Sequence, residues 1–274
     1  MNQPASPPRR PYVWALATSL LLALALYVWP STEPKLDADA PPADQQTNKP
    51  RKLSTEEINK SFAQKTFNTV YQRADWGKNK QGQGHSGAGS TAEATQRYRE
   101  FLEQFIKKHK IRSVVDAGCG DWEFSKLVDW QGVAYLGIDI SDQVVQRLIQ
   151  LHQKEHIRFR VGDVTEKLPS ADLLIIKDVL QHLPNLWIQR FIKNNLQKGR
   201  YRYAIITNDR DPKKHKNNKD IYVGSYREID LSLPPFSLKG LKDVMNFKAF
   251  PSKVAQVLKL KDEPIDSKPT NRAK

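Results

Sequence analysis

The sequence predicts an α/β fold: a mostly parallel sheet of seven strands, covered by helices on both faces and closed by an antiparallel hairpin. Three observations predict it. Short apolar runs alternate with amphipathic segments from residue 111 to residue 208, which is typical of a parallel sheet with helical connections. A Gly-x-Gly turn follows the first run. The last two runs, at 243–250 and 253–260, are joined by a short Pro-containing turn and predict a hairpin.

Two helices are predicted before the sheet. Residues 54–73 begin with a Ser-x-x-Glu capping signal and carry Ile58 and Phe62 at helical spacing. Residues 91–110 place apolar side chains on one face, which predicts an amphipathic helix. The loop between them contains four glycines between positions 82 and 89.

The alternating region divides into strands and helices by its apolar runs, and the segment after the glycine turn is also expected to be helical. The strands are expected at 111–117, 133–139, 157–163, 171–178 and 201–208, and the helices between them at 142–155 and 186–197.

An uncharged apolar segment, residues 12–29, precedes these elements. At 1.5 Å per residue it spans roughly 27 Å, close to the thickness of the hydrocarbon core of a bilayer. Tyr and Trp residues stand at both of its ends, as in interfacial aromatic belts. We expect a transmembrane anchor at 12–29 after a short tail at 1–11. A Pro-rich linker (30–53), a catalytic domain (54–262, with its first helices and glycine-rich loop at 54–110) and a disordered tail (263–274) follow.

A cleaved signal peptide is the alternative for residues 12–29, but the apolar run is longer than a typical signal core. Arg9 and Arg10 before the span favour an amino terminus inside, with the domain outside the cytosol, although the bias is small.

The composition narrows the partners but not the fold. The chain of 274 residues has a formal net charge of +14 and a pI near 9.7, which attracts nucleic acids, acidic lipids and other anions. Its single cysteine, Cys119, excludes an internal disulfide and a metal site built from cysteines. No metal is expected.

The glycine turn predicts a nucleotide-like ligand. Asp116, Gly118 and Gly120 end the first strand, where ligands bind in open α/β sheets. Asp139 ends the second strand, where a carboxylate accepts hydrogen bonds from ribose hydroxyls. A dinucleotide fingerprint requires a third glycine at position 123, which is Glu123, and no P-loop is present. We therefore expect a ligand with ribose and adenine but without phosphate.

Four motifs in order, "VVDAGCGDWEF", "YLGIDIS", "VGDVTEKLPSADLLIIKDVLQHL" and the closing hairpin, resemble the Rossmann-like S-adenosylmethionine-dependent methyltransferases over residues 111–260. The resemblance implies a three-layer sandwich and S-adenosylmethionine as cofactor. It implies that Asp116, Gly118 and Gly120 contact the methionine part and that Asp139 binds the ribose. It further implies that the adenine lies beside Asp163 and Val164.

Smaller motifs, "WG", "SGAGS" and "GSYREIDLSLPPF", resemble a bacterial-type branch of that family whose substrate is unknown. One position departs from the family pattern, because many members have a glycine where this chain has Trp122. The indole is expected to narrow the cofactor site or to form a wall of the substrate site. Asp139 as a plain turn residue, and Asp163 as a helix N-cap before Thr165, are the structural alternatives.

Asp178 and His182 follow the fourth strand, where the methyl acceptor is expected to bind. Methyl transfer depends on alignment, and a hydroxyl or ammonium acceptor also needs a base, for which a histidine is suited. The alternative is a structural or capping role for His182.

Three further residues are candidates for contact with the substrate. Trp76 begins a glycine-rich loop that is either a flexible surface loop or a lid over the site. Tyr226 and Arg227 lie between the fifth strand and the hairpin, and arginine is suited to a carboxylate or phosphate.

These features predict a membrane-anchored methyltransferase acting on an O or N atom of a small molecule, lipid or glycan. The alternatives are an RNA or protein methyltransferase and a catalytically inactive, membrane-tethered binding module. Nucleic acid is not favoured, because the Asn/Asp-Pro-Pro-aromatic signature of base methylation is missing after the fourth strand. Cofactor supply favours a cytoplasmic domain in a bacterium, whereas a lumenal domain is credible in a eukaryote.

Overall fold

A computed structural model describes residues 54–80, 85–210, 218–247, 250 and 252–261. The predicted anchor at 12–29, the linker and the carboxyl-terminal tail lie outside the described residues. Among the helices that are described, none combines the length and hydropathy needed to cross a bilayer.

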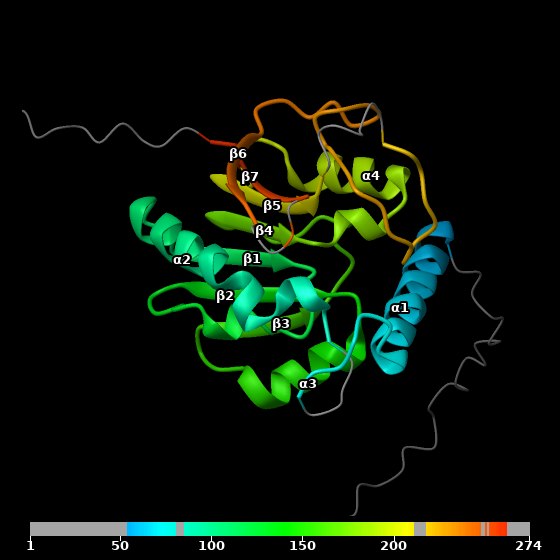
Figure 1. Cartoon of the computed structure of the whole chain (residues 1–274), viewed down its shortest axis with the longest axis horizontal. Coiled ribbons are helices and arrows are strands. Elements are labelled where there is room, and N and C mark those ends of the chain that lie inside the picture. The colour runs from blue at the N-terminus through cyan, green and yellow to red at the C-terminus, as the bar shows by residue number, and fades with distance from the viewer. Residues whose placement is uncertain (1–53, 81–84, 211–217, 248–249, 251, 262–274) are drawn as a thin grey trace, which may run out of the picture. The chain divides into compact units, whose positions relative to one another are not determined.

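The described domain is built on one sheet of seven strands (Figure 1), in the spatial order β3-β2-β1-β4-β5-β7-β6. Strands β1 to β5 are parallel, whereas β7 runs antiparallel to both β5 and β6. This confirms the predicted parallel sheet and its closing hairpin. The strands are β1 (Ser113–Ala117), β2 (Ala134–Asp139), β3 (Ile157–Val161), β4 (Leu173–Lys177), β5 (Tyr203–Asp209), β6 (Lys242–Asn246) and β7 (Lys253–Lys259).

Four α-helices accompany the sheet in the described residues, and each confirms a helix predicted from the sequence. They are α1 (Thr55–Arg73), α2 (Ala92–Lys108), α3 (Asp142–His152) and α4 (Asn185–Asn195). The capping box at Ser54 is present: its hydroxyl accepts the Glu57 amide, and the Glu57 carboxylate accepts the Ser54 amide. The apolar spacing of α1 is a poorer guide, because Ile58 and Phe62 are more than half exposed.

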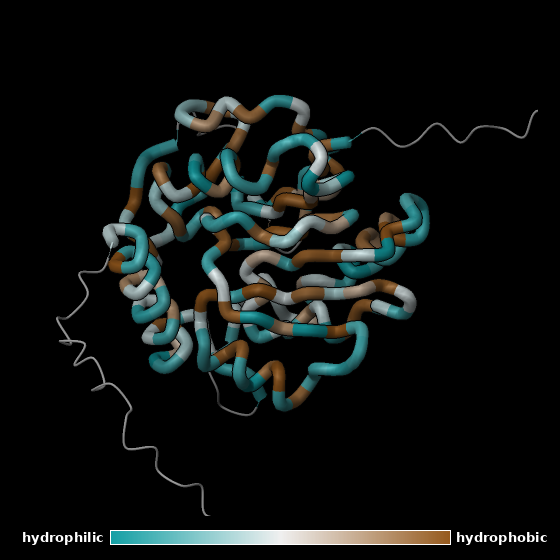
Figure 2. The backbone as a smooth tube through the Cα atoms, turned by 180° about the vertical axis from the view of Figure 1, so that it is seen from behind, coloured by the Kyte–Doolittle hydropathy of each residue, from teal (hydrophilic) through white to brown (hydrophobic). Residues whose placement is uncertain are grey.

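The core lies in two layers on opposite faces of the sheet. Neighbouring strand residues alternate between them, so that Val114 packs with α2 and α3 whereas Val115 packs with α4. Figure 2 shows the hydrophobic residues concentrated along the strands at the centre of the domain. Burial of apolar area on both faces is the main force that holds the helices to the sheet.

The helical layers are less complete than predicted. The segment after the glycine turn is not an α-helix, because it forms only a 3₁₀ turn at Ser125–Leu127. On the α4 face, residues 229–241 cover the sheet as an ordered loop that contributes Ile229 and Leu231 to the core. Pro234 and Pro235 lie in this segment, and proline removes the amide that a helix interior needs.

Candidate active site

A cavity of about 300 Å³ lies at the carboxyl ends of β1, β2 and β4, a volume at the lower end of the range for small-molecule sites. In Figure 1, α1 lies beyond these strand ends, and its side chains Phe67 and Tyr71 line the cavity. The loop at 86–90 forms another side of the wall. The sequence-predicted residues that line it are Trp76, Gly118, Gly120, Asp139, Asp163, Val164, Asp178 and His182.

The glycine turn requires glycine at both positions. Gly118 and Gly120 have φ values of +77° and +56°, which L side chains rarely adopt. A Cβ at Gly118 would lie 2.3 Å from Val179, and one at Gly120 would lie 2.2 Å from the Ser86 hydroxyl. The turn therefore lets the chain pass close to the cavity and to the loop that covers it.

Asp139 is held at the end of β2 by backbone donors. Its two oxygens accept the amides of Gly120, at 3.0 Å, and Ser141, at 2.9 Å. Burial raises the pKa of this carboxyl above its usual value, although these hydrogen bonds oppose the shift. A carboxylate oxygen has more than one acceptor site, so capacity remains for a ligand hydroxyl.

Asp163 and Val164 lie on the cavity wall beyond β3. The Asp163 carboxylate accepts the amide of Thr165 at 2.7 Å, but no helix begins there in the described chain. The alternative of a helix N-cap is therefore wrong, and the bond closes a local turn.

Asp116 is not among the residues that line the cavity. Its carboxylate lies inside the domain, where it accepts the hydroxyls of Tyr135 at 2.7 Å and Ser125 at 3.2 Å. Burial raises the pKa of Asp116 to about 6, despite the lowering effect of these two hydrogen bonds. The carboxylate nearest the glycine turn on the cavity wall is instead Asp121.

Trp122 contradicts the expectation that its indole narrows the cofactor site. It is buried in the core, where its ring packs against Tyr135, His152 and Phe159 rather than lining the cavity. Its φ of +61° lies in the left-handed region, which a glycine would adopt without strain. The aromatic contacts therefore compensate for a backbone conformation that tryptophan disfavours.

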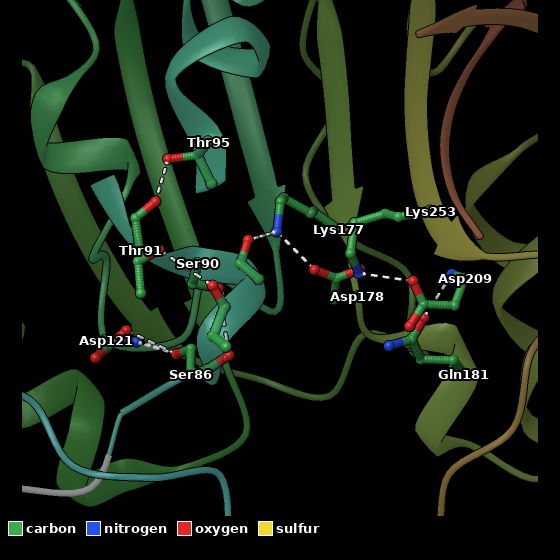
Figure 3. Close-up of polar contacts among 12 residues, drawn as sticks. Ser86, Ser90, Thr91, Thr95, Asp121, Lys177, Asp178, Gln181, Asp209 and Lys253 are labelled. Carbon is green, nitrogen blue, oxygen red and sulfur yellow. Dashed lines mark hydrogen bonds and ion pairs between the residues drawn. The ribbon is translucent and has the colours of Figure 1, made fainter. Parts of the chain in front are cut away.

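Asp178 belongs to a cluster of four charged side chains between the cavity and β7 (Figure 3). Its carboxylate pairs with Lys177, at 2.6 Å, and with Lys253, and Lys253 also lies 3.1 Å from Asp209. The strand pairing of Asp209 opposite Lys253 brings the two together. Burial opposes ionisation of Asp178, but the two ammonium groups outweigh it and hold the pKa of this carboxyl below its usual value.

The same cluster contacts the loop at 86–90. Lys177 donates a hydrogen bond of 2.8 Å to the carbonyl of Gly89, and Figure 3 shows this contact beside the ion pairs. A Cβ at Gly89 would lie 3.3 Å from a carboxylate oxygen of Asp178. The loop is therefore fitted closely onto the end of β4.

His182 lines the cavity four residues after Asp178. Its Nδ1 lies 3.0 Å from the carbonyl of Ser225, so the tautomer that satisfies this contact carries the proton on Nδ1. Burial lowers the pKa of His182, which favours the neutral ring. The ring is 5.2 Å from that of Trp76, so the indole forms an aromatic wall beside the imidazole. In this tautomer Nε2 keeps a lone pair.

Tyr226 and Arg227 do not line the cavity. The Tyr226 hydroxyl donates to Asp209 at 3.0 Å, and its ring lies 5.9 Å from that of His182. Arg227 donates to the side chain of Asn185 at 2.8 Å. Both side chains stand behind residues of the cavity wall rather than in it.

Several residues of the wall were not predicted from the sequence. They are Phe67, Tyr71, Ser86, Asp121, Lys177, Trp187, Asp209 and Lys253. Lys177 had a visible signal, since a lysine that ends a wholly apolar strand is rarely buried without a partner. Lys253 and Asp209 had none, because their contact depends on strands 44 positions apart that pair in a particular register.

The family comparison agrees with the fold and with this site. Residues 115–194 match the model described as "Methyltransferase domain". This segment contains the glycine turn, Asp139, Asp163 and His182. The chain therefore carries a Rossmann-like, S-adenosylmethionine-dependent methyltransferase domain, and its cofactor is S-adenosylmethionine. No curated protein sequence matches the chain.

Solved structures similar to this chain include several methyltransferases. The magnesium protoporphyrin IX methyltransferase of Synechocystis PCC 6803, with bound S-adenosylhomocysteine, is 16% identical, with 74% of this chain and 98% of that chain covered and a TM-score of 0.49. The methyltransferase domain of a bacterial CtHen1 protein is 17% identical, with 61% and 100% covered and a TM-score of 0.48. The N-methyltransferase NodS of Bradyrhizobium japonicum WM9 is 15% identical, with 60% and 86% covered and a TM-score of 0.43.

The residues of the cavity fit the cofactor's chemical groups. Asp139 offers carboxylate oxygens at the end of β2, and the glycine turn leaves open backbone beside it. Asp163 and Val164 supply a polar and an apolar wall farther along the same strand edge. We therefore assign the ribose to Asp139 and the adenine to the neighbourhood of Asp163 and Val164 as predictions, tested below.

Proposed function

We propose that this chain is a membrane-anchored methyltransferase that methylates an O or N atom of a small molecule, lipid or glycan. The observation that carries the acceptor chemistry is the environment of His182. With Nδ1 bonded to the Ser225 carbonyl, Nε2 is the ring nitrogen available to an acceptor. A neutral imidazole with a lone pair in a cavity is suited to take a proton from a hydroxyl or ammonium.

S-adenosylmethionine, when bound, supplies an electrophilic methyl group on a positively charged sulfur. The residues of this chain then have three tasks. Trp76 and Phe67 exclude water from one side of the acceptor, since their rings lie 6.2 Å apart at the cavity wall. His182 accepts the proton that the acceptor loses. Asp178, kept ionised by Lys177 and Lys253, supplies a fixed negative charge near the acceptor.

The membrane part of the proposal is supported by the sequence of residues 12–29 alone. We propose that this segment tethers the domain, which is cytoplasmic in a bacterial host, where the cofactor is made, or lumenal in a eukaryotic host. Nucleic acid as an acceptor has a weaker basis, namely the net charge of +14. RNA methylation predicts a steep loss of binding with salt, because phosphate contacts release counterions.

Transfer of a labelled methyl group tests the proposal. The full-length protein is incubated with labelled S-adenosylmethionine and, separately, with lipid, polysaccharide, small-molecule, protein and RNA fractions. We expect label in the lipid, glycan or small-molecule fraction and its loss in Asp139→Ala. Label confined to RNA or protein would refute the acceptor class. Cofactor binding without transfer to any fraction would instead favour a tethered binding module.

A further inference from the structure

Asp121 directly follows the glycine turn and has an incompletely bonded carboxylate. The residue is only 8% exposed and lines the cavity. One oxygen accepts the Ser86 hydroxyl at 2.7 Å, whereas the other, Oδ2, is buried without a hydrogen-bond partner in the described part of the chain. A buried carboxylate oxygen without a donor is unfavourable, so this oxygen is suited to a donor that arrives with a ligand.

The chemistry of the cofactor offers such a donor. Its methionine part carries an ammonium group with three N–H bonds, and an ammonium–carboxylate contact is among the stronger hydrogen bonds. The resemblance implied that Asp116 contacts this part of the cofactor, but Asp116 is turned into the domain towards Tyr135. Asp121 is the acidic side chain of the glycine-turn segment that both lines the cavity and keeps an unpaired oxygen.

We propose that Asp121 binds the ammonium group of the cofactor and links cofactor binding to closure of the loop at 86–90. The inference rests on S-adenosylmethionine as cofactor. The carboxylate serves both partners, because Oδ2 faces the ligand while the other oxygen holds Ser86. Its backbone amide also donates to the Ser86 hydroxyl at 3.0 Å.

The loop is positioned to respond to this contact. The Ser86 hydroxyl lies 3.0 Å from that of Tyr71, so it joins α1 to the glycine turn through Asp121. A ligand that orders the Asp121 carboxylate also strengthens the Ser86 contact, because the same side chain makes both. By linkage, a closed loop in turn retains the ligand more tightly.

Two ligands that differ in the methionine part separate this role from a merely structural one. Calorimetry on the full-length protein compares S-adenosylhomocysteine with 5′-methylthioadenosine, which keeps the nucleoside but lacks the ammonium group. Asp121→Asn is expected to weaken S-adenosylhomocysteine binding by about 10- to 100-fold and to leave methylthioadenosine within about twofold. Ser86→Ala is expected to weaken S-adenosylhomocysteine by about threefold to tenfold, again with little effect on methylthioadenosine. Asp129→Asn, an exposed acid outside the cavity, is the matched control.

Each other outcome overturns a defined part of the inference. Equal losses of both ligands in Asp121→Asn would make Asp121 a structural residue, and an unchanged affinity for S-adenosylhomocysteine would exclude the contact. Equal losses of both ligands in Ser86→Ala would overturn the link to the loop. Failure of the folded wild type to bind either ligand would overturn the cofactor assignment, and the inference with it.

Discussion

The imidazole of His182 makes the proposed chemistry sensitive to pH. Burial lowers its pKa, so the folded protein keeps the ring neutral to a lower pH than an unfolded chain does. Protonation removes the base, and we expect kcat/KM to fall only as the pH drops below about 6.5. His182→Gln is expected to lower kcat by about 10²- to 10⁴-fold and to abolish this acidic limb. A variant that loses activity but keeps the limb would assign the titration to another group.

Asp116 provides a second prediction at the residue scale, on stability rather than rate. Its folded pKa of about 6 exceeds the ordinary 3.8, so between these values the folded state binds the proton more tightly than the unfolded state. Ionisation of Asp116 therefore costs stability as the pH rises through this window, by about 3 kcal/mol in total. Asp116→Asn cannot ionise. Denaturant unfolding is expected to show its stability relative to wild type rising by up to that amount from pH 4 to pH 7, and a constant difference would contradict this.

Individual residues also mark the limit of prediction from sequence. The glycine turn and Asp139 were placed correctly on the cavity wall, because local motifs carry their own backbone geometry. Asp116 and Trp122 were not, since the direction of each side chain depends on what packs behind the strand. Tyr135 draws the Asp116 carboxylate inward, and Phe159 and His152 receive the indole.

At the scale of elements, β7 brings Lys253 into the charge cluster. Lys253→Met leaves Asp178 and Asp209 with only Lys177, and breaking a buried pair in this way is expected to destabilise the fold by about 3 kcal/mol or more. Lys253→Met combined with Asp209→Asn restores the charge balance, so we expect it to be less destabilised than the single variant. Lys242→Met, at an exposed position of β6, is the control. Urea unfolding measures all three, and strictly additive losses would show that the two side chains do not interact.

The elements themselves were predictable because their signals are periodic and local. The predicted helices and strands are all present, with ends that differ by a few residues. The segment after the glycine turn was the exception. Its Trp122 and Phe124 enter the core beside a 3₁₀ turn, where an α-helix had been expected. The pairing of β7 with β5 was foreseen as a hairpin, but its charged cross-strand contact was not.

At the scale of the whole molecule, the proposed anchor separates two behaviours. The full-length protein is expected to remain in the membrane pellet after alkaline extraction, because an apolar segment of this length partitions into the bilayer. Deletion of residues 1–30 is expected to release the domain while its affinity for S-adenosylhomocysteine changes by less than about twofold. Release of the full-length protein by alkali would contradict the anchor, and a large loss of affinity after the deletion would show that the segment also supports the site.

The position of Lys253 has a consequence for synthesis. A ribosome makes β1 to β5 well before it makes β7, so the nascent chain holds both acidic members of the cluster while only one of the two lysines exists. Until the hairpin docks, this end of the sheet has an excess of negative charge and lacks the strand that covers β5. We therefore expect translation intermediates that stop before residue 253 to be the species that chaperones recognise, and cofactor binding to begin only after the last strand has been added.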